Sequence, residues 1–64
     1  MISYDPLKEV LKQRNMKISD MREFLSSTTV SKISKNKNVE ISTIDKICLN
    51  LDIPVEKVIK FVKE

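Results

Sequence analysis

The chain has 64 residues, of which 41% are apolar and 33% are charged, and its formal net charge is +3 at pH 7. This profile predicts one globular domain over residues 1–64, with a core too small to enclose a small-molecule pocket. Because the sequence has no histidine, no glycine and a single cysteine, it lacks the commonest metal ligand, the usual general base, an internal disulfide and any glycine-rich phosphate loop. We therefore expect no enzymatic activity, no metal and no cofactor.

The first predicted helix spans residues 6–14. Leu7, Val10 and Leu11 recur at the spacing i, i+3, i+4, which places them on one helix face. A proline suits the first position of this helix, and an asparagine after it is suited to end it.

A second, shorter helix is predicted over residues 19–25. Ser19 and Asp20 fit its start, because the oxygens of such short polar side chains can accept hydrogen bonds from the free N–H groups of the first turn. Met21, Phe24 and Leu25 would then lie on one side of the helix and face the core.

The third predicted helix, residues 27–35, has two apolar anchors and a polar outer face. Val30 and Ile33 lie three residues apart and face the core together on a helix, whereas a strand would send them to opposite sides. Either Ser26 or Ser27 can cap its start. Hydroxyl and lysine side chains fill the remaining surface. In the polar segment that follows, asparagines tolerate the left-handed conformation that glycine usually takes.

Positive charge is concentrated in this part of the chain. Residues 24–39 carry three lysines and no acidic residue, whereas residues 1–23 carry five basic and four acidic groups and residues 40–64 carry four basic and five acidic groups. A short basic stretch without acids is an electrostatic footprint for nucleic acid. Charge alone leaves an alternative to nucleic-acid binding open, in which these lysines only form a solvated surface.

Two further helices complete the predicted fold. Residues 42–51 carry Ile44, Ile47 and Leu51 on one stripe. Residues 54–62 begin with proline at the first position and repeat apolar residues at i, i+3, i+4 and i+7. No strand hairpin is predicted, because the sequence has no Asn-Gly or Asp-Gly turn and no clean alternation. The expected fold is therefore all-α, a compact five-helix bundle.

The second and third predicted helices have the features of a helix-turn-helix. They are short and tightly joined, and the third is apolar inside and polar and basic outside, as a helix that enters the major groove requires. Four stretches make the likeness more specific: MISYDPL, LKQRNMKISDMRE, SSTTVSKISKNKNV and STIDKICLNLDI. With these stretches the chain resembles the Cro and lambda-repressor type helix-turn-helix domains (the XRE class), especially their small phage and mobile-element members.

This resemblance implies a lambda repressor-like DNA-binding domain that acts as a sequence-specific transcriptional regulator, a repressor and commonly a dimer, on double-stranded DNA. The residues that would face base edges are Ser27, Thr28 and Lys32. The residues that would contact the DNA backbone are Lys17, Ser19, Ser26, Thr29, Ser31, Lys35, Lys37 and Asn38. Tyr4 would either pack the amino-terminal arm onto the body or reach a phosphate through its hydroxyl.

Two departures from the family pattern leave a second function open. The turn between the second and third helices lacks the glycine that such domains usually place there for its positive φ, and the segment EFLSS is about two residues shorter than the usual pattern. The alternative is a protein-interaction module on the same scaffold, an antirepressor or inhibitor of another protein, with DNA binding weakened or lost. Phe61 and Val62 would either close the core or form a surface for a homodimer or a protein partner.

The sequence predicts no membrane segment. No apolar run approaches the roughly 18 residues that a membrane-spanning helix needs, and the first residues do not show the basic and then apolar stretches of a secretory signal. We therefore expect a cytoplasmic protein, encoded by a bacterium or a phage, with no membrane partner.

Overall fold

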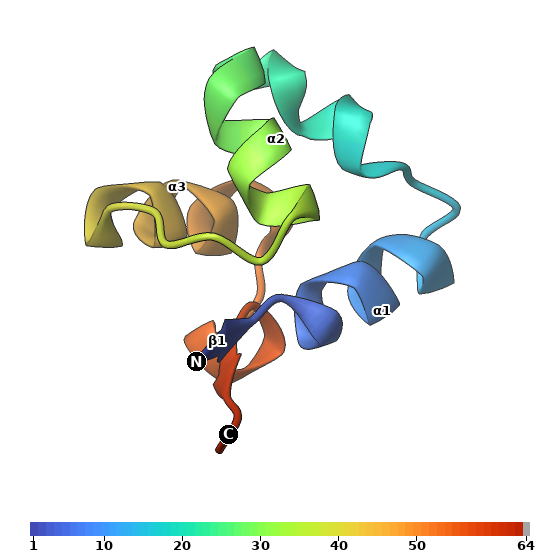
Figure 1. Ribbon diagram of the computed structural model, residues 1–64. Helices are drawn as coiled ribbons and strands as arrows, with labels where there is room; N and C mark the ends of the chain where they lie inside the picture. Colours follow the sequence, from blue (N-terminus) through green and yellow to red (C-terminus); the bar gives the residue numbers. More distant parts are fainter. Residues whose placement is uncertain (64) are drawn as a thin grey trace.

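The computed structural model describes residues 1–63, and three α-helices surround its centre (Figure 1). The elements in chain order are β1 (Ile2–Ser3), α1 (Asp5–Gln13), the 3₁₀ helix η1 (Ile18–Glu23), α2 (Ser27–Ser34), α3 (Ile41–Leu51), the 3₁₀ helix η2 (Val55–Lys57) and β2 (Lys60–Phe61). The two chain ends lie together at one end of the molecule, and α2 lies toward the other end. None of the helices within residues 1–63 has the length and apolar character needed to cross a membrane.

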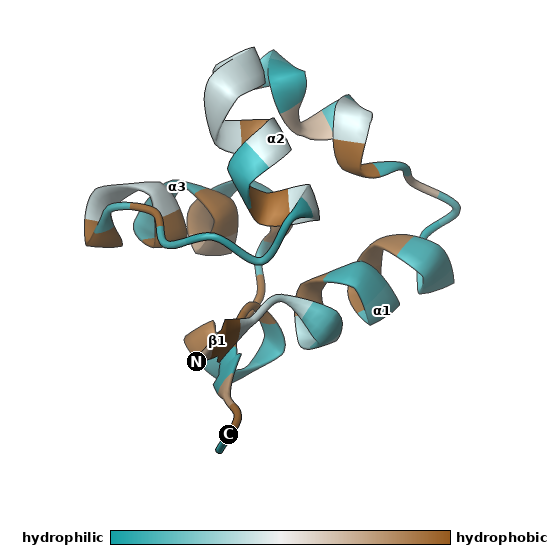
Figure 2. Cartoon of the chain, viewed as in Figure 1, coloured by the Kyte–Doolittle hydropathy of each residue, from teal (hydrophilic) through white to brown (hydrophobic). Residues whose placement is uncertain are grey.

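Three predicted helices lie where the sequence places them. The helices predicted over residues 6–14, 27–35 and 42–51 are α1, α2 and α3, and each observed end differs from the predicted one by at most one residue. Hydrophobic and hydrophilic segments alternate along each of them (Figure 2). The apolar spacing therefore identified these helices correctly.

The helix predicted over residues 19–25 is instead a 3₁₀ helix, η1. Met21 is fully buried and Leu25 is buried, whereas Phe24 is only half-buried. A 3₁₀ helix rises about 2.0 Å per residue, so six residues span about 12 Å, against about 9 Å for an α-helix. The more extended winding lets a short segment cover the distance between α1 and α2.

The helix predicted over residues 54–62 does not form, and the five-helix count is corrected accordingly. After the single turn of η2 the chain extends, and β2 pairs antiparallel with β1, with Ile2 opposite Phe61 and Ser3 opposite Lys60. Of the apolar residues that gave the helical spacing, Val58 is fully buried, whereas Val55 is 50% exposed. Valine and isoleucine favour extended chain, because their branched side chains are crowded in a helix. The partner of β2 is the amino-terminal strand β1, and the sequence around residues 54–62 does not indicate this partner.

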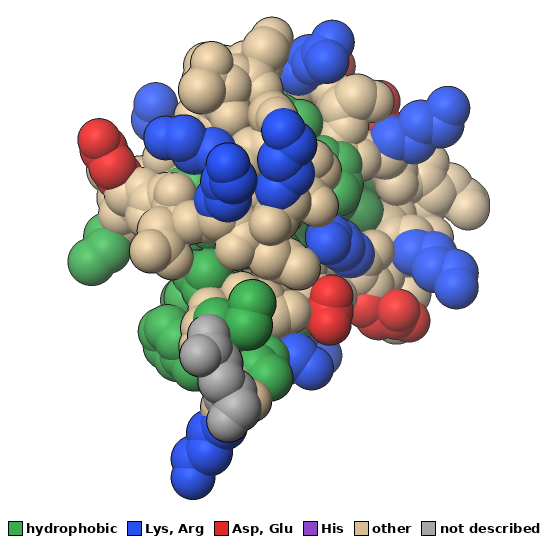
Figure 3. All heavy atoms as spheres, in the orientation of Figure 1, with side chains coloured by type: hydrophobic (Ala, Val, Ile, Leu, Met, Phe, Trp, Pro, Cys, Tyr) green, Lys and Arg blue, Asp and Glu red, His purple; other side chains and the backbone are tan. Residues whose placement is uncertain are grey.

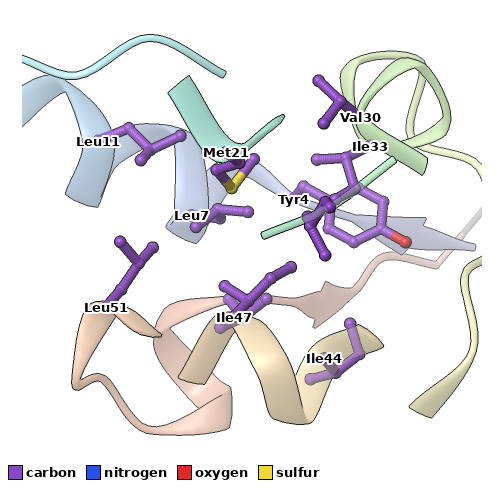
Figure 4. Close-up of a cluster of buried hydrophobic side chains, with 11 residues drawn as sticks. Tyr4, Leu7, Leu11, Met21, Val30, Ile33, Ile44, Ile47 and Leu51 are labelled. Carbon is purple, nitrogen blue, oxygen red and sulfur yellow. The ribbon is translucent and has the colours of Figure 1, made fainter. Parts of the chain in front are cut away.

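The core contains side chains from all three α-helices and from η1. Fully buried members are Tyr4, just before α1, and side chains of α1, η1, α2, α3 and the segment after η2, and Figure 4 shows most of them meeting at the centre. The largest fully buried side chains are Tyr4, Leu7, Leu11, Met21, Ile33, Ile47 and Val58. A further contact ties two helix ends together, because Arg14 Nη1 donates to the carbonyl oxygen of Leu51 at 2.6 Å.

Each α-helix is followed by a residue in the left-handed conformation, and none of these residues is glycine. Asn15 has φ 56° after α1, Asn36 has φ 56° after α2, and Asp52 has φ 54° after α3. Short polar side chains visit this region more readily than other non-glycine residues. The predicted use of asparagine in place of glycine is confirmed at Asn36, and Asn15 ends the first helix as expected.

Candidate nucleic-acid interface

The orientation of α2 is fixed by its cap and by two buried side chains. Ser26 is the N-cap, and its Oγ accepts a hydrogen bond from the N–H of Thr29 at 3.2 Å. Val30 and Ile33 point inward and are 6% and 0% exposed. The cap is therefore Ser26 rather than Ser27, and the opposite face of α2 is turned to solvent.

The outer face of α2 and the segment after it form one open depression of about 450 Å³. The residues that line it are Ser27, Thr28, Ser31, Lys32, Lys35 and Lys37. All six are exposed. The structure thus brings together the three residues predicted to face base edges and three of those predicted to contact the DNA backbone.

This surface is polar and positive. Lysine side chains gather over α2 and the segment that follows it, and the acidic side chains visible on this face lie outside the group (Figure 3). No acidic residue occurs in residues 24–39. The short hydroxyl side chains allow the α2 backbone to approach a ligand closely, and hydroxyls can donate to or accept from base edges. Lysine ammonium groups attract phosphates.

Hydrogen bonds from two sides hold the segment after α2. The N–H of Asn36 donates to the oxygen of Ile33 at 3.1 Å, and that of Lys37 donates to the oxygen of Lys32 at 2.8 Å, which is a Schellman ending. From the other side, the Tyr4 N–H donates to Asn36 Oδ1 at 3.1 Å. The Tyr4 hydroxyl donates to the oxygen of Lys37 at 2.6 Å. Lys37 is thereby held beside the last turn of α2.

Tyr4 is buried, so its hydroxyl is not available to a phosphate. Its ring lies in the core cluster, and its oxygen points away from that cluster (Figure 4). Burial raises the pKa of the phenol, against a smaller lowering by a backbone hydrogen bond from Val39. Of the two alternatives for Tyr4, the structure supports packing of the amino-terminal arm. Sequence reasoning missed its bond to Lys37, because the two residues are far apart in the chain.

Five other predicted contact residues lie outside the depression. Ser26 and Thr29 lie at the start of α2, and their hydroxyls are hydrogen-bonded to each other at 2.9 Å. Asn38 is exposed just beyond Lys37. The remaining two, Lys17 and Ser19, lie at the start of η1 and are exposed.

The backbone at the start of η1 already has a partner. The N–H of Lys17 donates to the carboxylate of Asp20 at 2.8 Å. A negative charge therefore lies where the resemblance places a phosphate, and the N–H of Lys17 is occupied.

The joint between η1 and α2 needs no glycine. Phe24 has φ −130° and Ser26 has φ −69°, and Leu25 is not among the residues with positive φ. The N–H of Leu25 donates to the oxygen of Met21 at 2.9 Å, which closes the end of η1. The missing turn glycine is thus explained by a joint that stays in conformations open to any residue.

Cys48 takes no part in this surface. It is half-buried on α3 and packs against the core. Burial raises the pKa of its thiol, and the nearby charge of Asp45 adds to the effect. The thiol is therefore protonated at neutral pH and is a poor nucleophile.

Phe61 and Val62 do not close the core. They are 80% and 39% exposed, and Met1, which lies opposite the end of β2, is 66% exposed. The N–H of Val62 donates to the oxygen of Met1 at 2.8 Å, and the amino-terminal ammonium donates back to the oxygen of Val62 at 2.7 Å. The chain ends therefore present three exposed apolar side chains, which we call together the terminal patch (Met1, Phe61 and Val62).

Comparison with known proteins identifies the architecture. Residues 6–64 match the family of Cro/C1-type HTH DNA-binding domains. The chain is also similar to a solved structure, the crystal structure of the transcriptional regulator VanUg in its form II, with 32% sequence identity and a TM-score of 0.91. That match covers 98% of this chain and 87% of the other. No curated protein matches the chain significantly. The expected all-α, helix-turn-helix class is confirmed.

Proposed function

Because the chain belongs to the Cro/C1-type helix-turn-helix family of DNA-binding domains, we propose that it is a sequence-specific transcriptional regulator, a repressor, that inserts α2 into the major groove. The observation that carries this proposal is the depression on α2, where three hydroxyl side chains and three lysines meet without an acidic neighbour in their segment. Such a regulator would act in the cytoplasm, on the bacterial chromosome or on a mobile element.

Each group of residues has a different part in the proposed complex. Ser27, Thr28 and Lys32 face base edges, where lysine can donate to guanine O6 and N7 and a hydroxyl can contact any base. The second group contacts phosphates and sets the register of α2, and these contacts supply most of the salt-dependent affinity. Its members are Lys17, Ser19, Ser26, Thr29, Ser31, Lys35, Lys37 and Asn38.

We propose further that two copies pair through the terminal patch. Phe61 and Val62 are apolar and exposed, and such a patch on a small domain is typical of a protein contact. A two-fold dimer would read two half-sites about one helical turn apart, roughly 34–36 Å. Sedimentation of the wild type and of Phe61→Ser at equal concentrations tests this, with a dimer expected for the wild type and a monomer for the variant.

The decisive experiment is a fluorescence-anisotropy titration with two labelled duplexes at about 50 and 200 mM salt. One duplex comes from upstream of the gene that encodes this protein, and the other is unrelated. We expect the first to bind at least about a thousandfold more tightly, with a steep loss of affinity at the higher salt. Equal binding of both duplexes would contradict specific regulation by this site.

The exposed terminal patch also favours the second candidate function, an interaction module that holds another protein. This candidate predicts no binding of either duplex at low salt and stoichiometric co-elution with a protein partner. Because Phe61 and Val62 are exposed, Phe61→Ala and Val62→Asp would weaken such a complex without unfolding the domain. Circular dichroism of both variants checks that the helices are intact.

A further inference from the structure

Tyr4 joins the amino-terminal arm to the lysine-bearing segment beyond α2. Its main chain and its side chain bond to two consecutive residues of that segment, at Asn36 Oδ1 (3.1 Å) and at the oxygen of Lys37 (2.6 Å). Tyr4 itself is fully buried in the core and lies between β1 and α1. The position of this segment is therefore set by the core, across 33 residues of sequence.

The three lysines of the depression differ in how they are held. Lys32 lies within α2 and Lys35 is its C-cap, so the helix itself places both. Lys37 lies two residues beyond the cap, after the left-handed Asn36. Apart from the Schellman bond to α2, the hydrogen bonds that place this part of the chain come from Tyr4.

We propose that Tyr4 is a positioning residue for DNA binding, which keeps Lys37 within reach of a phosphate beside α2. This inference rests on the proposed function. The Tyr4 hydroxyl acts through the Lys37 carbonyl and does not touch DNA. Without that donor the Lys37 carbonyl loses its partner and must turn toward water, which loosens the chain at and beyond Lys37, while the bonds to Asn36 and to α2 remain.

The variant Tyr4→Phe isolates the hydroxyl, because phenylalanine keeps the ring in the core and removes only the oxygen that donates to Lys37 and accepts from the backbone of Val39. The expected result is the loss of one phosphate contact. Each such contact contributes about 0.9 to the slope of log affinity against log salt, so the affinity ratio between about 50 and 200 mM salt should fall roughly three- to fourfold. The preference for the upstream duplex over the unrelated one should stay as in the wild type.

A second measurement follows the segment without DNA. Backbone amide relaxation by NMR should show lower order parameters at Lys37 and Asn38 in Tyr4→Phe than in the wild type, with the α2 amides unchanged. Lys37→Ala serves as the reference for the lost contact, and adding Tyr4→Phe to it should change the salt slope no further. Val58→Ala, a core change on the segment after η2, should leave the slope at the wild-type value although it lowers stability.

The outcomes separate the two proposals. If the wild type binds the upstream duplex and Tyr4→Phe keeps the wild-type salt slope or the wild-type order parameters, the hydroxyl is only a satisfied core group and the positioning role is wrong. If the wild type binds neither duplex at low salt, the proposed function fails, and the positioning role fails with it. A reduced salt slope together with lower order parameters at Lys37 in Tyr4→Phe supports both the proposed function and the positioning role of Tyr4.

Discussion

The two faces of α2 separate, within eight residues, the side chains that hold the fold from those that we propose to bind DNA. The inner face consists of Val30 and Ile33, which are buried and fix where the helix lies. On the outer face, the side chains of Ser27, Thr28 and Lys32 are exposed and lie outside the hydrophobic core. We therefore expect substitutions on the outer face to change DNA binding without changing stability. Substitutions on the inner face should change stability without changing a DNA contact.

The largest effect is expected on the inner face. Ile33→Ala removes a fully buried side chain and should lower the free energy of unfolding by about 2–5 kcal/mol. Urea denaturation followed by circular dichroism measures this. Ser31→Ala, on the outer face of the same helix, is the control and should stay within about 0.5 kcal/mol of the wild type. A loss below about 1 kcal/mol for Ile33→Ala would show that α2 is not held by this residue.

The next largest effect is expected when the charge on the outer face is reversed. Lys32→Glu combined with Lys35→Glu should weaken binding of the upstream duplex by at least about 100-fold at low salt, because two phosphate or base contacts become repulsive. The free energy of unfolding should change by less than about 0.5 kcal/mol, since both side chains are exposed.

A matched control for this variant lies at the far end of the molecule. Lys57→Glu combined with Lys60→Glu changes the net charge by the same amount, and both residues are exposed on η2 and β2. This control should bind DNA far more tightly than the α2 variant. Equal loss in both variants would mean that net charge, and not the α2 surface, governs binding.

A smaller effect distinguishes two neighbouring serines at the start of α2. Ser26→Ala removes the N-cap acceptor and should lower the free energy of unfolding by about 1 kcal/mol. Ser27→Ala removes an exposed hydroxyl and should leave stability near the wild type while weakening DNA binding. Thermal unfolding and the anisotropy titration of both variants test this. The reverse result would assign the cap to Ser27.

The smallest effect appears in alkaline solution. Burial raises the pKa of Tyr4 in the folded protein above its ordinary value of 10.0, so the folded state keeps the phenolic proton to higher pH than the unfolded chain does. The contribution of Tyr4 to stability is therefore fully present below the pKa that the phenol has in the unfolded chain. It is lost as the pH rises through the higher pKa that the phenol has in the folded protein. Urea denaturation between about pH 8 and 11 should show a steeper loss of stability for the wild type than for Tyr4→Phe, which lacks this group. Parallel curves would contradict the assignment to Tyr4.

Local spacing predicted the part of the molecule that is built from local contacts. The i, i+3, i+4 pattern located α1, α2 and α3, and the same pattern showed which face of α2 carries hydroxyls and lysines. It failed at residues 54–62, where an equally regular pattern forms one 3₁₀ turn and then a short strand that pairs with β1. Nothing near those residues indicates that partner, because it lies at the other end of the chain.

The bonds of Tyr4 could not be predicted for the same reason. Its partners Asn36 and Lys37 lie more than 30 residues away in the sequence. An asparagine after α2 was an adequate signal for the left-handed turn, but not for the acceptor that its side chain offers to Tyr4. Side-chain bonds between distant segments depend on the finished packing, and the spacing of apolar residues says nothing about them.

The pairing of β1 with β2 has a consequence for folding kinetics. The bonds between Met1 and Val62 join residues 61 positions apart, whereas η1 and α2 contact each other across a short joint. Contacts of long sequence separation carry a larger loop-closure entropy and slow the step that forms them. We therefore expect the helices to assemble first and the chain ends to pair last. Hydrogen exchange should show the reverse order in opening, with the ends separating far more often than α2 leaves the core.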